Sequence, residues 1–233
     1  MKTFRAKRGP FREQPYFTDQ EIKSICVDEL QRQGLLPSEP AAIRIERFVE
    51  KRFNIVVEPA PLPQGVLGVT RFGSGGVQAM YVAESLDADK TTSAVRRVRS
   101  TIAHEAGHAL LHAHLFAVPS TTPLFGDATD PIAPKVLCRD GAIESANRGY
   151  SGEWWEFQAN AGMSHLLLPK RLVHQAVQRF LIPVGGLGGM QIDPDRHFQA
   201  VQSITEIFDV NPAMARIRLE SLYAASGDRQ LSL

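Results

Sequence analysis

Cysteine is scarce in this chain of 233 residues, and its two cysteines, Cys26 and Cys138, stand far apart with no motif spacing. This excludes a disulfide framework and predicts free thiols in a reducing compartment. A run of about 18 apolar residues, the length that crosses a membrane, is also lacking. The N-terminus carries charges with no apolar stretch after them, which predicts no secretory signal. We therefore expect a cytoplasmic protein with no membrane segment.

A surplus of charge of one sign is lacking as well. The chain has 26 Lys and Arg residues against 25 Asp and Glu residues, a formal net charge of +1. No global field therefore favours nucleic acids or acidic substrates. The hydrophobic content of 43% is ordinary for a globular protein, and the length predicts one domain or one domain with a helical appendage.

Three segments differ in their residue patterns. Residues 1–17 contain five basic residues and two prolines, and we expect a flexible basic arm there. Residues 18–169 mix helical and strand patterns and predict the main, α+β domain. Residues 170–233 predict a helical C-terminal region, in which Gly185–Gly189 is typical of a loop.

Two helices are predicted at the start of the main domain. Thr18 and Glu21 have the spacing of a capping box, which opens a helix that runs to Gly34. Cys26 lies on the apolar stripe of this helix and is expected to be a small core residue. A second helix is expected to begin at Ser38.

A small sheet is predicted next. Three valine-rich runs bounded by proline and glycine predict strands at Asn54–Glu58, Gly65–Phe72 and Val77–Ala83. The glycine-rich residues 73–76 predict a hairpin turn between the last two. A further short strand is expected at Lys135–Arg139. The long helix that follows contains His104-Glu105-x-x-His108, and a small sheet placed before a helix with this motif resembles the layout of zincin peptidases, in which substrate would pair with the edge strand.

The long helix, predicted over Thr92–Phe116, carries a His-Glu-x-x-His motif. On a helix, His104 and His108 are four residues apart and share a face, so both imidazoles can bind one zinc ion. Glu105 follows the first ligand, where it can take a proton from metal-bound water. Gly107 costs about 1 kcal/mol in mid-helix relative to alanine, which indicates a close approach of another segment.

The same helix offers two further histidines as a third protein ligand. His112 lies eight residues after His104. That spacing is about 12 Å along the axis, too far for one metal if the helix continues. His114 has the metzincin spacing, but Leu111 stands where that pattern needs a glycine. Both are therefore expected to lie beside the ligands or at the surface.

A carboxylate from a later helix is the second source of this ligand, and the one we favour. Ser151 opens a helical pattern that contains Glu156, with Glu153 as the alternate ligand. Asn160 lies one turn after Glu156, where its amide could accept a hydrogen bond from a ligating histidine and fix its tautomer. The third source is an aspartate of the loop, for which no pattern speaks: Asp127, Asp130 or Asp140.

The loop over Ala117–Gly152 is long for a compact domain. Loops of this length commonly act as lids over functional sites or are disordered. Cys138 falls within it, on the predicted short strand. We expect a partly buried strand cysteine there rather than an inhibitory thiolate on the metal.

Two stretches together resemble a known family. Arg99–His112 reads RSTIAHEAGHALLH, and Glu156–Pro169 reads EFQANAGMSHLLLP. They resemble the ImmA/IrrE family of metallopeptidases, whose pattern is T-x-A-H-E-x-G-H-x-x-x-H followed by E-x-x-A-N-x-F-A-x-x-L-L-x-P. The resemblance spans roughly Ile43–Pro169. It departs from the family at Gly162 and Met163, where Phe and Ala are common.

The resemblance implies a gluzincin-like fold in which His104, His108 and Glu156 bind Zn²⁺ and Glu105 is the general base. It also implies a zinc-dependent endopeptidase of limited specificity. Its substrate would be a transcriptional repressor with a helix-turn-helix, in a stress-response or mobile-element system. The residue that stabilises the oxyanion has four candidates: Tyr81, Tyr150, His165 and His174.

The C-terminal region carries a weaker signal. Ile204–Leu222 predicts two helices joined by a turn at Asp209–Asn211, which resembles a helix-turn-helix. Its second helix offers only Arg216 and Arg218, a thin basic footprint, so we expect it to pack on the catalytic domain rather than to bind DNA. The alternative to a peptidase is a zinc-containing regulatory module that docks a protein partner or DNA without proteolysis.

Overall fold

The computed structural model describes residues 2–5, 13–73, 75–116, 135–139, 154–184 and 189–223. The strands of the described chain are β1 (Lys2–Arg5), β2 (Glu13–Tyr16), β3 (Val57–Ala60), β4 (Val66–Gly73), β5 (Gly76–Ala83), β6 (Lys135–Arg139), β7 (Leu181–Val184) and β8 (Gly189–Ile192). The α-helices are α1 (Asp19–Arg32), α2 (Ile45–Phe53), α3 (Glu84–Ala88), α4 (Thr92–Leu111), α5 (Ala113–Phe116), α7 (Trp154–Leu167), α8 (Lys170–Val177), α9 (His197–Phe208) and α10 (Pro212–Tyr223). Two 3₁₀ turns are η1 (Gln178–Phe180) and η2 (Pro194–Arg196). The fold is therefore mixed α+β.

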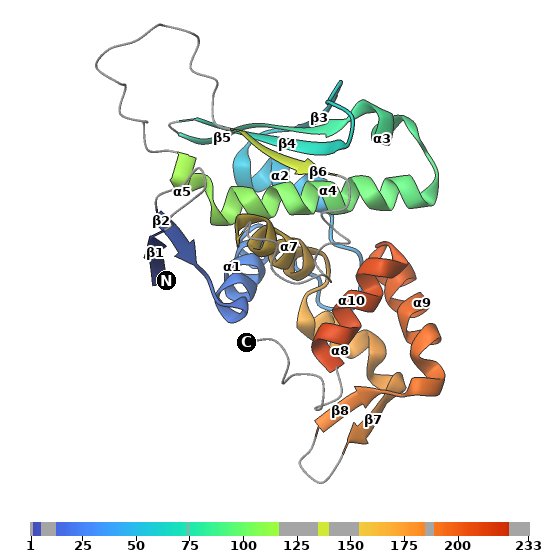
Figure 1. Ribbon diagram of the computed structural model, residues 1–233. Coiled ribbons are helices and arrows are strands. Elements are labelled where there is room, and N and C mark those ends of the chain that lie inside the picture. The colour runs from blue at the N-terminus through green and yellow to red at the C-terminus, as the bar shows by residue number, and fades with distance from the viewer. Residues whose placement is uncertain are drawn as a thin grey trace, which may run out of the picture.

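A mixed sheet of four strands covers one side of α4 (Figure 1). The strand order is β3-β5-β4-β6, with β3 parallel to β5 and the other neighbours antiparallel. The predicted hairpin is confirmed, since β4 and β5 pair up to Gly73 and Gly76. Gly76 has φ +108°, a conformation that glycine adopts without strain. The predicted short strand is also present as β6, at the edge beside β4.

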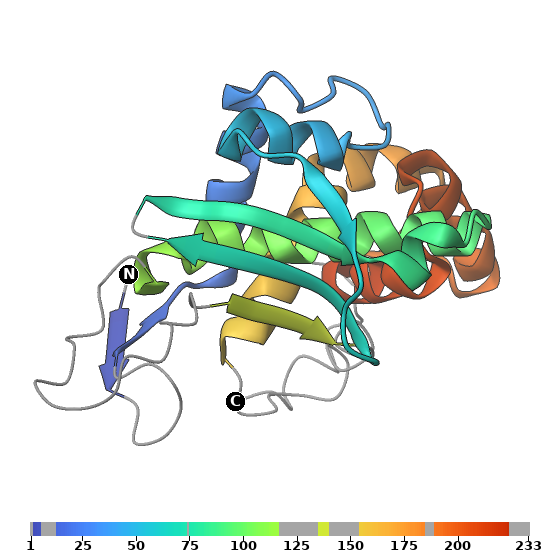
Figure 2. The ribbon, with the colours of Figure 1, turned by 90° about the horizontal axis from the view of Figure 1, so that it is seen from above.

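The opposite side of α4 packs on α1 and α7, so α4 lies between the sheet and a helical layer (Figures 1 and 2). At the crossing with α7, a Cβ added to Gly107 would lie 2.8 Å from the carbonyl oxygen of Ala159. Gly162 of α7 faces the same place, since a Cβ added to it would lie 3.2 Å from the Cα of Gly107. The expected close approach at Gly107 is thus a helix–helix contact, and the small residues allow the two backbones to touch.

One hydrophobic core joins the main domain to the C-terminal region. It contains buried side chains from α1 to α10, including Cys26, Phe48, Ile102, Leu166 and Phe208. Cys26 is completely buried, as its place on the apolar stripe of α1 indicates. Burial also raises the pKa of its thiol to about 12, which keeps the thiol protonated and unreactive.

Two predicted helix boundaries were wrong. The second helix begins at Ile45 and not at Ser38, because backbone carbonyls before it are bound from elsewhere. Arg171 donates to the carbonyl oxygen of Ser38 at 3.0 Å, and Arg99 to that of Ile43 at 2.9 Å. The motif helix ends at Leu111 rather than running to Phe116. His112 leaves the helical region at φ −120°, ψ −5°, and the short α5 follows.

Other segments differ from the patterns seen in the sequence. Lys2–Arg5 and Glu13–Tyr16, inside the expected basic arm, pair as an antiparallel ribbon. β7 and β8 form a second hairpin on either side of the glycine-rich stretch, where only a loop was expected. Four-residue strands of this kind are too short for alternation of apolar residues to identify them.

The helix pair α9–α10 packs against the rest of the protein. Asp209, in the left-handed conformation at φ 51°, ends α9, and α10 begins at Pro212 as predicted. Arg96 and Arg99 of α4 both form ion pairs with Asp209, at 2.9 and 3.4 Å. Arg218, one of the two arginines of the thin basic footprint, is only 5% exposed and donates to the carbonyl oxygen of Leu168. Its charge therefore serves an internal contact.

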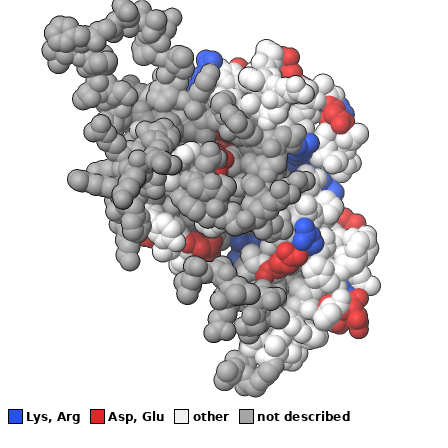
Figure 3. All heavy atoms as spheres, viewed as in Figure 1, with Lys and Arg blue, Asp and Glu red and all other residues white. Residues whose placement is uncertain are grey.

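The described charged side chains on the visible surface do not form a patch of one sign. In Figure 3, basic and acidic side chains are interspersed over the described residues of the visible face, and neither sign forms a continuous stripe. Among the described residues, no helix combines the length and apolar character required to span a bilayer.

Candidate metal centre

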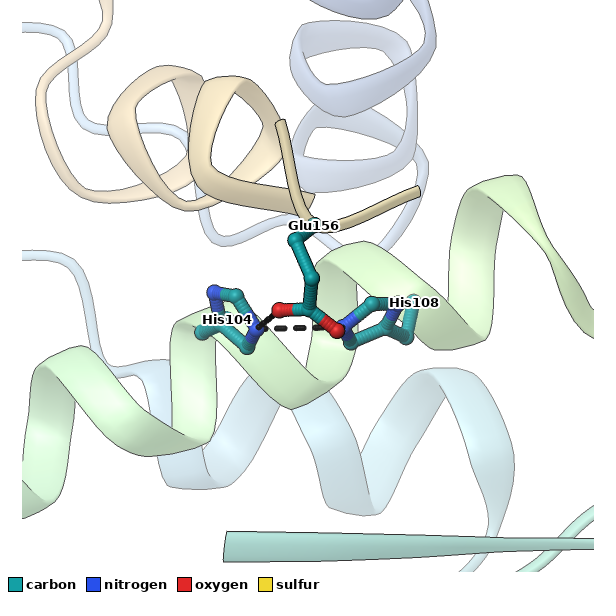
Figure 4. Close-up of side chains that lie close together, drawn as sticks. All are labelled: His104, His108 and Glu156. Atoms are coloured by element: carbon teal, nitrogen blue, oxygen red, sulfur yellow. Dashed lines mark hydrogen bonds and ion pairs between the residues drawn. The ribbon is translucent and has the colours of Figure 1, made fainter. Parts of the chain in front are cut away.

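His104, His108 and Glu156 meet where α4 crosses α7 (Figure 4). The two histidines lie one turn apart on α4, and Glu156, in the first turn of α7, extends its carboxylate between their rings. The two Nε2 atoms are 3.0 Å apart. The carboxylate oxygens lie 3.1 Å from His104 Nε2 and 3.4 Å from His108 Nε2.

These separations fit a small divalent metal ion. Zinc binds histidine nitrogen and carboxylate oxygen at about 2.0–2.2 Å, so neighbouring ligand atoms of a tetrahedral site lie about 3.3 Å apart. The two Nε2 atoms are 3.0 Å apart, Glu156 Oε2 lies 3.1 Å from His104 Nε2 and Glu156 Oε1 lies 3.4 Å from His108 Nε2, so each carboxylate oxygen is about this distance from one of the nitrogens. Two imidazoles and one carboxylate are also a donor set that zinc accepts while one position stays open. The three side chains could therefore hold a metal ion.

Burial and mutual contact shift the pKa values of this group. Both histidines are completely buried, and burial lowers the pKa of His108. Burial on its own would raise the pKa of Glu156, but hydrogen bonds and charge from His104 and His108 outweigh it and hold that pKa below its ordinary value. Glu156 is thus ionised at neutral pH. An ionised carboxylate is the form that binds a metal ion, and a bound ion would replace the protons through which the two histidines contact it.

Side chains of α7 contact the outer ring nitrogens. Asn160 Oδ1 lies 2.9 Å from His104 Nδ1, as the spacing from Glu156 led us to expect. An amide oxygen only accepts, so His104 carries a proton on Nδ1, which leaves Nε2 as the ring nitrogen that could bind a metal ion. His108 Nδ1 lies 3.0 Å from His112 Nδ1, and His112 Nε2 lies 3.1 Å from Gln158 Oε1.

Glu105 lies on the face of α4 that the sheet covers. It is completely buried, and Thr70 Oγ1 of β4 donates a hydrogen bond to its Oε2. Gly68 leaves room for it, since a Cβ there would lie 2.9 Å from Glu105 Oε1. The carboxylate is therefore held in one orientation by a central strand.

The alternate ligands lie elsewhere. His112 is buried behind His108 and contacts its outer nitrogen rather than the group of three. His114 is exposed on α5. The remaining alternate ligands fall outside the described residues: Glu153, Asp127, Asp130 and Asp140. The side chain of Cys138 is not described either.

The oxyanion candidates are reduced by position. His165 is nine residues after Glu156, about 13 Å further along α7. There it is hydrogen-bonded to Asp19 and Arg218. His174 is hydrogen-bonded to Tyr223 in the C-terminal region. Tyr81 is on β5 under the guanidinium of Arg71, and Tyr150 falls outside the described residues.

Three residues near the centre were not predicted from the sequence to take part in it. Gln158 and Trp154 of α7 both contact the ring of His112, Trp154 edge-on with centroids 5.4 Å apart. Thr70 contacts the proposed base. The spacing of Glu156, Gln158 and Asn160 at every second position was visible in the sequence, but it has no helical meaning until α4 is placed beside α7.

In comparisons with known proteins, no protein-family model matches the chain, and no curated protein is significantly similar to it.

Proposed function

We propose that this protein is a zinc-dependent endopeptidase with a zincin-like fold of the gluzincin type, related to the ImmA/IrrE family that its motifs resemble. The convergence of His104, His108 and Glu156 within 4.8 Å of one another, in a buried site, carries this proposal. The arrangement of a motif helix below a small mixed sheet, with a carboxylate from a later helix, supports it.

Zinc held by these three side chains would polarise the scissile carbonyl and lower the pKa of a bound water from about 15.7 to about 7. The protein's own part in catalysis falls to Glu105. Its carboxylate takes the proton from the attacking water and delivers it to the leaving amine nitrogen. Thr70 holds this carboxylate through a buried hydrogen bond, so it requires little reorganisation to act.

The proposed substrate is a protein and not a peptide nutrient. By the resemblance, it is a transcriptional repressor with a helix-turn-helix, whose cleavage switches on stress-response or mobile-element genes. The burial of Arg218 in α10 supports a role of the C-terminal helices in packing. In this proposal the repressor, and not this protein, binds DNA.

A trapping experiment tests this function. Glu105→Gln should keep a full equivalent of zinc but stall hydrolysis, because an amide cannot accept the proton. The variant is immobilised in lysate of its native cell, and the captured proteins are identified by mass spectrometry. Glu84→Gln, an exposed glutamate on α3, is the matched control.

We expect Glu105→Gln to retain a repressor-like protein that the wild type and Glu84→Gln cleave. A captured protein that none of the three cleaves, with biological function intact in Glu105→Gln, would instead establish a zinc-containing binding module. Loss of zinc from Glu105→Gln would contradict the assignment of Glu105 as a base outside the ligand set.

A further inference from the structure

The outer ring nitrogen of His108, Nδ1, reaches α7 only indirectly, whereas that of His104 contacts it directly. The amide oxygen of Asn160 contacts His104 Nδ1 directly at 2.9 Å. On the other histidine, the ring of His112 stands between His108 and the nearest amide, that of Gln158. All of these groups are at most 7% exposed, so bulk water does not replace their contacts.

The chemistry of the acceptor assigns the protons along this chain. Gln158 Oε1 can only accept, so the His112 nitrogen 3.1 Å from it, Nε2, carries a proton. In a neutral ring the other nitrogen, Nδ1, is then an acceptor. It lies 3.0 Å from His108 Nδ1, which must supply the proton between them. His108 is left with its lone pair on Nε2, the atom that faces His104 and Glu156.

We propose that Gln158, acting through His112, is a positioning residue that sets the tautomer of His108 and so prepares its Nε2 for the metal. The inference rests on the metal centre of the proposed function, but not on peptidase activity. Helix α7 would then supply the third ligand and both amide acceptors, from positions 156, 158 and 160.

Packing holds this relay of Gln158, His112 and His108 in place. Trp154 closes one side of His112, with ring planes 89° apart. The contact of Gly107 with Ala159 brings the backbone of α7 against α4 between the two amides. A rotation of His112 would therefore meet Trp154 on one side and leave buried donors unpaired, which is unfavourable where water cannot replace the lost contacts.

Zinc affinity and histidine tautomers test the relay without an activity assay. Four proteins are compared: the wild type, Gln158→Met, Gln158→Glu and Gln202→Met. Gln158→Met keeps the length of the side chain and removes the acceptor, whereas Gln158→Glu keeps an acceptor. Gln202→Met makes the same replacement at an exposed position of α9. Zinc dissociation constants come from competition with a chelator, and long-range ¹H–¹⁵N spectra of the zinc-loaded proteins report the tautomer of each ring.

We expect His112 in the wild type to carry its proton on Nε2. Partners that orient zinc ligands contribute about 10- to 100-fold to metal affinity, so Gln158→Met should weaken zinc binding by about that factor. Gln158→Glu and Gln202→Met should bind zinc within about threefold of the wild type, because the acceptor survives in one and the relay is untouched in the other.

Two results would overturn the relay while leaving the metal centre intact. One is the finding that His112 in the wild type carries its proton on Nδ1. That measurement does not depend on the folding of any variant. The other is a Gln158→Met protein that binds zinc as tightly as Gln202→Met. A wild type that binds no zinc would be a different failure, since it removes the metal centre together with the relay.

Discussion

A cluster that contains buried histidines lies near each end of helix α7, and the two clusters have different chemistry. At the start of α7, Glu156 meets two imidazoles whose outer nitrogens contact Asn160 and His112. At its end, His165 lies between Asp19 of α1 and Arg218 of α10. The first cluster directs three electron-pair donors at one point. The second contains its own cation.

The hydrogen bonds of the second cluster are complete without a metal. Arg218 donates to His165 Nδ1 at 3.0 Å and to the carbonyl oxygen of Leu168 at 3.1 Å. His165 then donates from Nε2 to Asp19 at 2.8 Å. That hydrogen bond, from His165, lowers the pKa of Asp19, and burial lowers the pKa of Arg218 to about 10, so both stay charged at neutral pH. A buried histidine beside a carboxylate is therefore not in itself a sign of a metal site.

The largest contrast is expected from removing the carboxylate of each cluster. Glu156→Ala should weaken zinc binding by about 1,000-fold or more, beyond the 10- to 100-fold of an orienting partner, because a ligand is lost. Asp19→Asn should leave zinc affinity unchanged. Chelator competition measures both. Equal losses in the two variants would mean that the clusters are not chemically distinct.

Removal of the cation of the second cluster, Arg218, should lower the stability of the protein. Arg218→Met breaks a buried charged contact and should lower the free energy of unfolding by about 3 kcal/mol. Arg216→Met, at a position whose side chain is 47% exposed, should change it by less than about 0.5 kcal/mol. Denaturant titration of the zinc-loaded proteins measures the difference. A helix that used both arginines to bind DNA would show similar small effects on stability at the two positions.

The crossing of α4 and α7, at the first cluster, can be disturbed at the contact between Gly107 and Ala159. Gly107→Ala places a Cβ 2.8 Å from the carbonyl oxygen of Ala159 and should cost about 2 kcal/mol, because two backbones must part. It should also weaken zinc binding, since α7 carries Glu156. Gly162→Ala meets the Gly107 Cα at 3.2 Å, and its better helix propensity offsets most of the strain, so we expect it near neutral. Thermal unfolding with and without zinc checks both variants.

Acidification should reveal the smallest effect, that of His165. Burial lowers its pKa, so below the unfolded value of about 6.5 the unfolded chain binds a proton that the native protein does not. Stability therefore falls as the pH falls from 7 to 5, by up to about 1.4 kcal/mol per pH unit for this one group. His165→Gln should flatten the slope relative to the wild type. A slope that steepens instead would mean that native His165 is protonated.

Several local features were predictable because they depend on residues close together in the chain. The capping box of Thr18 and Glu21 forms, with Glu21 N 3.3 Å from Thr18 Oγ1, and Cys26 is in the core. The β4–β5 hairpin follows from its glycines. The start of α2 was not predictable, because arginines far away in sequence bind the carbonyls before it.

The sequence by itself determined that His104, Glu105 and His108 follow one another on a helix, because four residues make about one turn. It also brought Glu156 and Asn160 forward as partners through their spacing. Only the tertiary structure decided that Gln158 reaches His112, that Thr70 holds Glu105 and that Arg218 is buried. These contacts join residues between 35 and 53 positions apart. Helical periodicity is local, whereas the register of α7 on α4 depends on the packing of Gly107 against Ala159, which no periodicity encodes.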